Sequence, residues 1–202
     1  MHGSFVSPQA TLGTDVKIGR FCIVEDGVEL ADGVVLEDYA MVLTGARIGA
    51  RTKIGTYTKI GRDVRIGADC SFTSFCEIRD KCELGDRVLM GSRGTLSAGT
   101  VVEDEVVMKY AFVVTDTPDL QKNNEKSVGR LKRKSRFGAS VVIMPSVVIG
   151  ENSEIGACSQ VRKDVPDNQV WFGTPAKYYR DVDATAAPAA PAAPVRKLAL
   201  AR

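Results

Sequence analysis

Histidine is nearly absent from this 202-residue chain: His2 is the only one, and it precedes the repeat described below. A three-histidine metal site is therefore excluded, as is a catalytic imidazole inside the repeat. No apolar run approaches the roughly 18 residues needed to span a bilayer. The first residues, MHGSFVSPQA, lack the basic and apolar regions of a signal peptide. We therefore expect a cytoplasmic protein.

A strong charge of one sign is also missing, because the formal net charge is only +2. The chain as a whole thus has no strong attraction for nucleic acid or for a membrane surface. The sequence contains neither the Walker pattern nor the Rossmann glycine pattern, which excludes the common nucleotide-binding folds. The length suits one domain with a sizeable core.

A six-residue repeat dominates the sequence, as in RIGARTKIGTYTKIGRDVRIG at residues 47–67. Every sixth residue from Val6 to Val114 is apolar, and the residue two positions earlier is usually small. Two inward residues separated by one outward residue indicate a short strand, and the period of six indicates a turn after each strand. Glycine often follows the large residue, where it relieves crowding at the bend.

Three such strands close a triangular coil of about 18 residues, and coils stack at about 4.8 Å through parallel ladders. The sequence therefore predicts an all-β parallel β-helix. The series stops after Val114 and restarts at Phe137, so we expect about eight coils and an inserted loop at 115–136. Residues 163–180 would cap the last coil. Together, 1–180 form the domain, and 181–202 form an Ala/Pro-rich disordered tail.

Five cysteines raise the question of a metal or redox site. Four of them, Cys22, Cys70, Cys76 and Cys82, occupy the small inward position, where a free cysteine packs as a small hydrophobe. Neighbouring hexads face different sides of the triangle, which favours core packing over a zinc site. We expect no metal. Cys158 lies outside this inward series.

A basic cluster lies at the end of the expected loop, at Arg130, Lys132, Arg133, Lys134 and Arg136. Two interpretations stay open for it. The cluster is either a solvated loop or a contact for the phosphate of a nucleotide or of coenzyme A, with Arg133 and Lys134 as substrate-binding residues.

The repeat, the single loop and the segment FGASVVIMPSVVIGENSEIGACSQVRKDVPDNQVWFGTPAK (137–177) resemble the hexapeptide-repeat acyltransferases with a left-handed β-helix. The resemblance covers about residues 5–180, and the left hand is implied by it alone. Within the superfamily the chain is most similar to N-acetyltransferases of nucleotide-linked amino sugars. The resemblance implies a homotrimer that binds acetyl-CoA in the cleft between two subunits.

Site residues follow from the same resemblance. The coenzyme would run past Gly138, Ala139, Ala157 and Cys158, with Lys163 near a phosphate. In some relatives an asparagine of a coil holds the substrate amine, and the equivalent position in this sequence is Ser92 or Arg93.

The repeat contains no histidine that could act as a general base, and this absence favours an amine over a hydroxyl as the acceptor. A sugar hydroxyl needs a positioned base, whereas a sugar amine has a pKa only about one to two units above neutrality. Positioning alone could therefore suffice, with the proton passing to solvent or to a carboxylate such as Asp116. Two alternatives stay open: an O-acetyltransferase that acts on a sugar or other small molecule, and a non-catalytic binding or assembly module.

Overall fold

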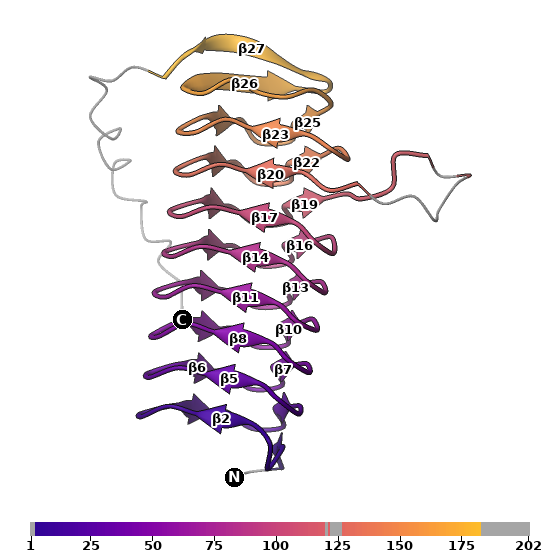
Figure 1. Ribbon diagram of the computed structural model, residues 1–202. Coiled ribbons are helices and arrows are strands. Elements are labelled where there is room, and N and C mark those ends of the chain that lie inside the picture. The colour runs from indigo at the N-terminus through magenta and orange to yellow at the C-terminus, as the bar shows by residue number, and fades with distance from the viewer. Residues whose placement is uncertain (1–2, 120, 122–126, 183–202) are drawn as a thin grey trace, which may run out of the picture.

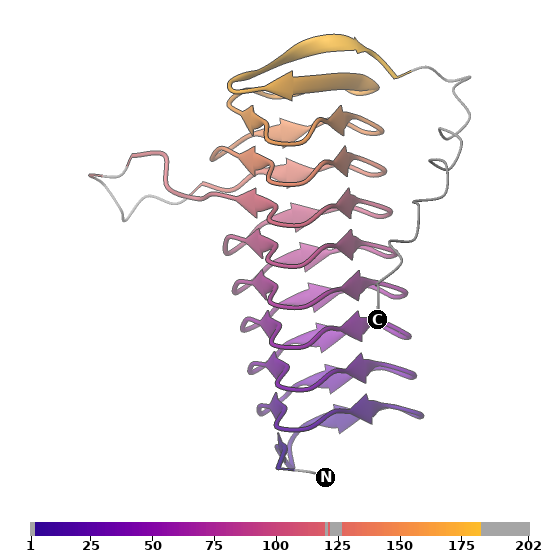
Figure 2. The same ribbon diagram turned by 180° about the vertical axis from the view of Figure 1, so that it is seen from behind.

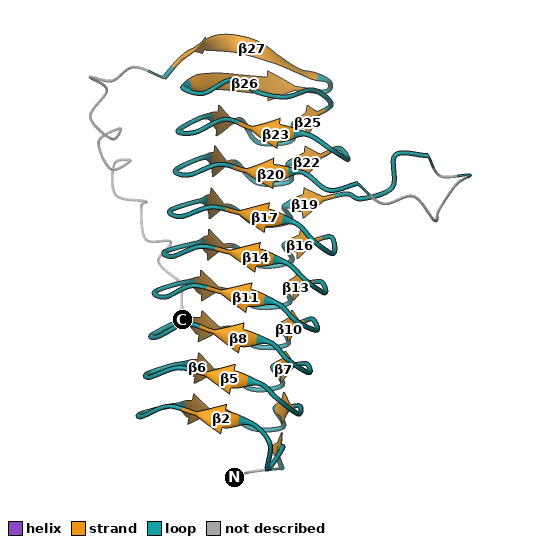
Figure 3. Cartoon of the chain, viewed as in Figure 1, coloured by secondary structure: helices purple, strands orange, loops and turns teal. Residues whose placement is uncertain are grey.

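A computed structural model describes residues 3–119, 121 and 127–182 of the chain. His2 and nearly all of the expected tail lie outside these residues. Every regular element among them is a strand, and the coils stack into one column (Figures 1 and 3). In the part of the chain described, no helix is long and apolar enough to cross a membrane.

The column has three faces, each a sheet of parallel two-residue strands, to which the longer cap hairpin is added on face C. Face A consists of β1 (Phe5–Val6), β4 (Ile23–Val24), β7 (Met41–Val42), β10 (Lys59–Ile60), β13 (Glu77–Ile78), β16 (Thr95–Leu96), β19 (Val113–Val114), β22 (Val142–Ile143) and β25 (Gln160–Val161). Face B consists of β2 (Thr11–Leu12), β5 (Glu29–Leu30), β8 (Arg47–Ile48), β11 (Arg65–Ile66), β14 (Glu83–Leu84), β17 (Val101–Val102), β20 (Arg130–Leu131) and β23 (Val148–Ile149). Face C consists of β3 (Lys17–Ile18), β6 (Val35–Leu36), β9 (Lys53–Ile54), β12 (Ser71–Phe72), β15 (Leu89–Met90), β18 (Val107–Met108), β21 (Arg136–Phe137), β24 (Glu154–Ile155) and the cap strands β26 (Gln169–Gly173) and β27 (Ala176–Asp181).

Stacking in register places each residue on the one 18 positions later. Lys59 pairs with Glu77, and Ile60 pairs with Ile78. The large inward residues form the core: Ile60, Ile78 and Leu96 are all fully buried. Outward residues therefore also form straight lines along each face. The turns between faces form three edges, called here AB, BC and CA after the strands that each turn joins in chain order.

The inserted loop leaves the column after β19 and is shorter than the expected 115–136. The repeat resumes at β20, where Arg130 pairs with Val101 and Leu131 is fully buried. Gly129 and Leu131 supply the small and large inward residues of this hexad, which lies six positions before Phe137. The loop therefore spans 115–129, and the basic cluster lies on coils rather than in a loop. Figures 1 and 2 show the chain leaving the column at this point.

A hairpin closes the C-terminal end of the column. Strand β26 extends face C in parallel with β24, and β27 returns antiparallel to β26. Trp171 packs against the core, and its indole Nε1 donates a hydrogen bond to Gln169 at 2.9 Å. The hairpin covers strand edges and apolar side chains that an open end would expose.

The glycine after the large residue is required by the neighbouring coil. At Gly49 an added Cβ would lie 2.5 Å from the carbonyl carbon of Gly67 and 2.6 Å from its oxygen. Gly49 has no left-handed φ, whereas Gly27 does, at +65°. The spacing between coils, and not only the bend, therefore excludes a side chain at Gly49.

We predict that Gly49→Ala destabilises the protein by about 3 kcal/mol or more, because backbone atoms cannot move away from the new methyl group. Gly27→Ala is the control, since its new Cβ has no heavy atom nearer than 3.9 Å. Its left-handed backbone adds a penalty of only roughly 1–2 kcal/mol. Urea unfolding of both variants measures the difference, and equal losses would contradict the explanation.

Candidate active site

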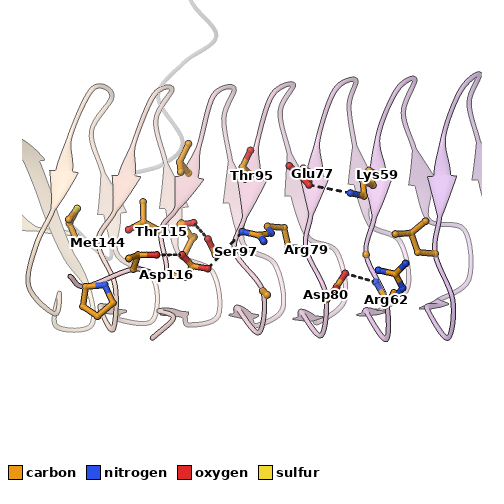
Figure 4. Close-up of a pocket in the computed structure, with 17 residues that line it drawn as sticks. Lys59, Arg62, Glu77, Arg79, Asp80, Thr95, Ser97, Thr115, Asp116 and Met144 are labelled. Atoms are coloured by element: carbon orange, nitrogen blue, oxygen red, sulfur yellow. Dashed lines mark hydrogen bonds and ion pairs between the residues drawn. The ribbon is translucent and has the colours of Figure 1, made fainter. Parts of the chain in front are cut away.

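A groove of about 770 Å³ runs along face A and edge AB beneath the base of the inserted loop (Figure 4). Outward side chains of successive face-A strands form one wall, with Lys59, Glu77 and Thr95 one above another. Turn residues of edge AB and the loop base, Thr115–Pro118, form the other side. The solenoid register brings these residues together, although they are spread over more than fifty positions of the sequence.

Four of the charged side chains that line the groove form pairs of opposite sign. Lys59 Nζ lies 3.6 Å from the Glu77 carboxylate, and Arg79 lies 3.8 Å from that of Asp116. Asp80 accepts a hydrogen bond from the Arg62 backbone N–H at 2.8 Å. The groove therefore offers both charges and hydroxyl groups to a polar ligand without a large excess of either sign.

Asp116 is held in place at the root of the loop. Its side chain is only 13% exposed, and it accepts a hydrogen bond from the Thr117 hydroxyl at 2.9 Å. The Asp116 carbonyl accepts a bond from the Ser127 backbone N–H at 2.9 Å, which joins the two ends of the loop. The carboxylate predicted as a proton acceptor thus lies in the groove, beside Arg79.

The expected coenzyme residues lie on edge CA, as do Ser92 and Arg93. Cys158 N–H donates to the Ala139 carbonyl at 2.8 Å, so the turns of neighbouring coils contact each other directly. A Cβ at Gly138 would lie 2.5 Å from the Ala157 nitrogen. Ser92 Oγ is 2.9 Å from the Thr73 hydroxyl oxygen. The expected coenzyme positions on this edge, Gly138, Ala139, Ala157 and Cys158, therefore carry only small side chains.

Face A separates Ser92 and Arg93 from the groove, because they lie on its opposite edge. Arg133 and Lys134 lie on the third edge, BC, where Arg133 pairs with Glu151 at 3.3 Å. The structure therefore does not bring these two cations to Asp116 within one chain.

A second cavity, of about 500 Å³, lies between the last coil and the cap hairpin. Three cations line it, Arg162, Lys163 and Lys177, together with the aromatic rings of Trp171 and Tyr178, and none of its described lining residues is acidic. The adjacent Thr174 hydroxyl donates to the Cys158 carbonyl at 3.0 Å, which connects this cavity to edge CA. An anion with an apolar portion fits this environment.

The sequence predicted roles for Asp116, which lies in the groove, and for Lys163, which lies in the cap cavity, but not for most other groove residues or for Arg162 and Lys177. Outward residues do not repeat every six positions as the inward ones do, so the hexad pattern does not select them. Opposite charges 18 positions apart, as in Lys59 and Glu77, were the one signal that pointed to the groove. No such spacing marks Lys177, because it lies on the antiparallel cap hairpin and not in the repeat, and the hairpin places it in the same cavity as Lys163.

Burial determines the state of the four inward cysteines. It raises the pKa of Cys70 and of Cys82 to about 11, and it also raises the pKa of Cys22 and Cys76. Cys158 is exposed, and all five thiols are free. Among the described residues, no group of three or more His, Cys, Asp or Glu side chains could hold a metal ion.

Known proteins match part of the chain in sequence. No protein-family profile matches it. The galactoside O-acetyltransferase of Lactococcus lactis is 42% identical over 69 residues, which is 33% of each chain. That of Escherichia coli is 49% identical over 47 residues, or 23% of each chain. The chain thus spans about a third or less of the length of these curated relatives.

Solved structures match nearly the whole column. The UDP-N-acetylglucosamine acyltransferase LpxA of Bacteroides fragilis superposes with a TM-score of 0.73 at 16% identity, covering 87% of this chain and 72% of that one. The corresponding enzyme of Campylobacter jejuni gives a TM-score of 0.62 at 16% identity, covering 88% and 72%. The protein is therefore a left-handed parallel β-helix, as predicted. Its homologues include hexapeptide-repeat acetyltransferases, which confirms the resemblance.

We predict that Cys158 alone is alkylated rapidly in the native protein at about pH 8, because the thiolate is the reactive form and burial disfavours it at the other four sites. Mass spectrometry after brief maleimide treatment measures the number of modified thiols. Cys158→Ser is the control and should remain unmodified, whereas denaturant should expose the remaining thiols. Rapid native labelling of a second cysteine would contradict the core assignment.

Proposed function

We propose that the protein is an acyl-CoA-dependent N-acyltransferase that transfers an acetyl group from acetyl-CoA to an amino sugar. The observation that carries this proposal is the groove at the loop base, where Asp116 is fixed beside Arg79. The acetyltransferases among its homologues support the reaction class. We also propose that the working form is a homotrimer, as the family resemblance implies.

Acetyl-CoA would supply the acetyl group as a thioester, and two features of the chain fit this donor. At the C-terminal part of edge CA, only the small side chains of Ala139, Ala157 and Cys158 lie beside Gly138, and Ala157 and Cys158 are exposed. The cap cavity beyond Cys158 holds three cations for phosphate groups and aromatic rings for an adenine base. Lys163 lines this cavity, which supports the proposed contact with a phosphate.

The acceptor would lie in the groove on face A. Its paired charges favour a ligand that carries hydroxyl groups and one amine rather than a ligand with a large net charge. The phosphates of a nucleotide-linked acceptor would have to reach Lys59 or Arg62 at the lower end of the groove. Arg133 and Lys134 lie on edge BC and give no support to a phosphate contact within the same chain.

Acyl transfer would proceed by direct attack of the free amine on the thioester carbonyl carbon. A C–N bond forms, the C–S bond breaks, and the coenzyme leaves as a thiolate. The nitrogen loses its proton to solvent or to the Asp116 carboxylate. The ion pair with Arg79, at 3.8 Å, holds that carboxylate in place. Because edge CA and the groove lie on opposite sides of face A within one chain, edge CA of a neighbouring subunit of the proposed trimer would present the thioester to the amine.

A second candidate is O-acyl transfer, because the matched curated relatives include galactoside O-acetyltransferases. A hydroxyl acceptor would need Asp116 as a true base. A panel of free amino sugars, nucleotide-linked amino sugars and galactosides, each with acetyl-CoA, distinguishes the two. Thiol release with amino sugars alone supports N-transfer, release with galactosides alone replaces it by O-transfer, and release with none would overturn enzymatic function.

We predict that Asp116→Asn lowers kcat/KM by about 100-fold or more, because the amide neither pairs with Arg79 nor accepts a proton. Glu29→Gln is a matched control, since Glu29 forms an ion pair of 3.3 Å with Arg47 on face B, away from the groove. It should leave both activity and stability nearly unchanged. Equal activity of Asp116→Asn and the wild-type protein would remove Asp116 from the mechanism.

We also predict that kcat/KM rises tenfold per pH unit until the pKa of the acceptor amine, about one to two units above neutrality, and then levels off. The free amine is the nucleophile, and no histidine lies among the described residues, so no further bend should occur near the ordinary histidine pKa of about 6.5. His2→Ala should leave the profile unchanged. A bend near neutrality that this variant abolishes would contradict histidine-free transfer.

A further inference from the structure

Two hydroxyl side chains of the groove, those of Ser97 and Thr115, lie at the same turn position of neighbouring coils. Strand β16 pairs in register with β19, and Ser97 and Thr115 are the residues that directly follow these two strands. Equivalent atoms of the two residues are therefore about 4.8 Å apart. Both side chains line the groove, as does that of Asp116, the residue after Thr115 (Figure 4).

The two hydroxyl groups have fixed directions, because each donates its proton to a backbone carbonyl. Ser97 Oγ lies 2.8 Å from the Val114 carbonyl oxygen, and Thr115 Oγ1 lies 2.9 Å from that of Ile143. A carbonyl oxygen only accepts, so the hydroxyl must be the donor in both bonds. The lone pairs of the two hydroxyl oxygens are therefore left for a ligand, and their protons are not.

A carboxylate adds further acceptor atoms to this part of the groove. The side chain of Asp116 is only 13% exposed, and an ionised carboxylate accepts hydrogen bonds without donating any. Ser97 is only 6% exposed, so little water competes for its lone pairs. Arg79, one coil earlier, lies 3.8 Å from the Asp116 carboxylate. The side chains of Ser97, Thr115 and Asp116, called here the oxygen cluster, thus offer acceptors to a ligand.

The spacing and the polarity of the oxygen cluster fit a primary amine. An amine that donates its two N–H groups at about 2.9 Å, with a tetrahedral angle between the bonds, reaches oxygens about 4.7 Å apart. This distance matches the spacing of the coils. We propose that Ser97 and Thr115 bind the acceptor amine through its two N–H groups, which leaves the nitrogen lone pair for the thioester. This amine subsite rests on the proposed acyl transfer.

The same two residues would discriminate against a hydroxyl acceptor. An alcohol has a single O–H donor, so it can bond to only one of the two hydroxyl oxygens, and its own lone pairs then face those of the other. A buried acceptor atom left without a donor lowers affinity roughly tenfold or more. Ser97 and Thr115 therefore determine the specificity for an amine over a hydroxyl.

Equilibrium binding tests the amine subsite with no acetyl-CoA present. The probes are glucosamine and glucose, which differ only by an amine in place of one hydroxyl, and isothermal calorimetry measures their affinities. The wild-type protein should bind glucosamine at least about tenfold more tightly than glucose. Thr115→Val and Ser97→Ala should each lower this preference roughly tenfold, whereas Thr115→Ser keeps the hydroxyl and should retain it.

Ser135→Ala is the matched control. Ser135 is buried beside edge BC, and its hydroxyl also donates to a carbonyl at 2.8 Å, that of Lys132. The control should leave the preference unchanged. Thr115→Val should fold, since the backbone N–H of Thr115 has its own bond of 3.0 Å to the Ile143 carbonyl. A wild-type protein without preference for glucosamine, or a preference that survives in Thr115→Val or in folded Ser97→Ala, would overturn the amine subsite.

The amine subsite and the proposed function can fail separately. Preferential binding of glucosamine without thiol release from acetyl-CoA would keep the amine subsite and remove the transferase function. Thiol release with an amino sugar at equal kcat/KM in the wild-type protein and in Thr115→Val would keep the transferase function and overturn the amine subsite.

Discussion

The close stacking of identical coils is the constraint on which the rest of this structure depends. Backbone N–H and carbonyl groups of one coil bond to the next, as in Lys59 N–H to the Cys76 carbonyl at 2.9 Å. At that spacing there is no room for a side chain at positions such as Gly49. Every side chain must then point into the triangular core or outward along a straight line. Both the core and the surface therefore consist of lines of residues separated by 18 positions.

This constraint explains why the fold could be predicted from the sequence and the site only in part. Inward positions must be apolar, so their period of six is visible without a structure. Outward positions are free to vary, and the groove residues Lys59, Thr95 and Asp116 carry no common pattern. Asp116 could be proposed from the sequence because it lies at the start of the loop. Arg79, its ionic partner, could be found only once the register placed the two turns together.

The loop boundary was wrong for a related reason. Basic residues flank Leu131, and this composition resembles a loop more than a coil. The inward pair Gly129 and Leu131 nevertheless satisfies the packing rule, and packing outweighs the polarity of the flanking residues. As a result, Arg130 and Arg133 lie on coils, where they pair with Glu103 at 2.7 Å and Glu151 at 3.3 Å. Their charges are largely balanced by acidic residues of neighbouring coils.

The three edges of the solenoid can carry different kinds of residues, because a change at one edge leaves the strand pairing of the faces intact. The loop enters at edge AB without breaking the column, since Val113 still pairs with Val142 and Val101 with Arg130 across the interruption. The core therefore tolerates the inserted loop, which replaces a single turn at edge AB. Charged pairs such as Arg51 and Asp69 occupy edge BC, whereas exposed aromatic side chains such as Tyr39 and Tyr57 occupy edge CA. Face A lies between edge AB, which carries the loop, and edge CA, so the groove and the exposed aromatic side chains border the same sheet.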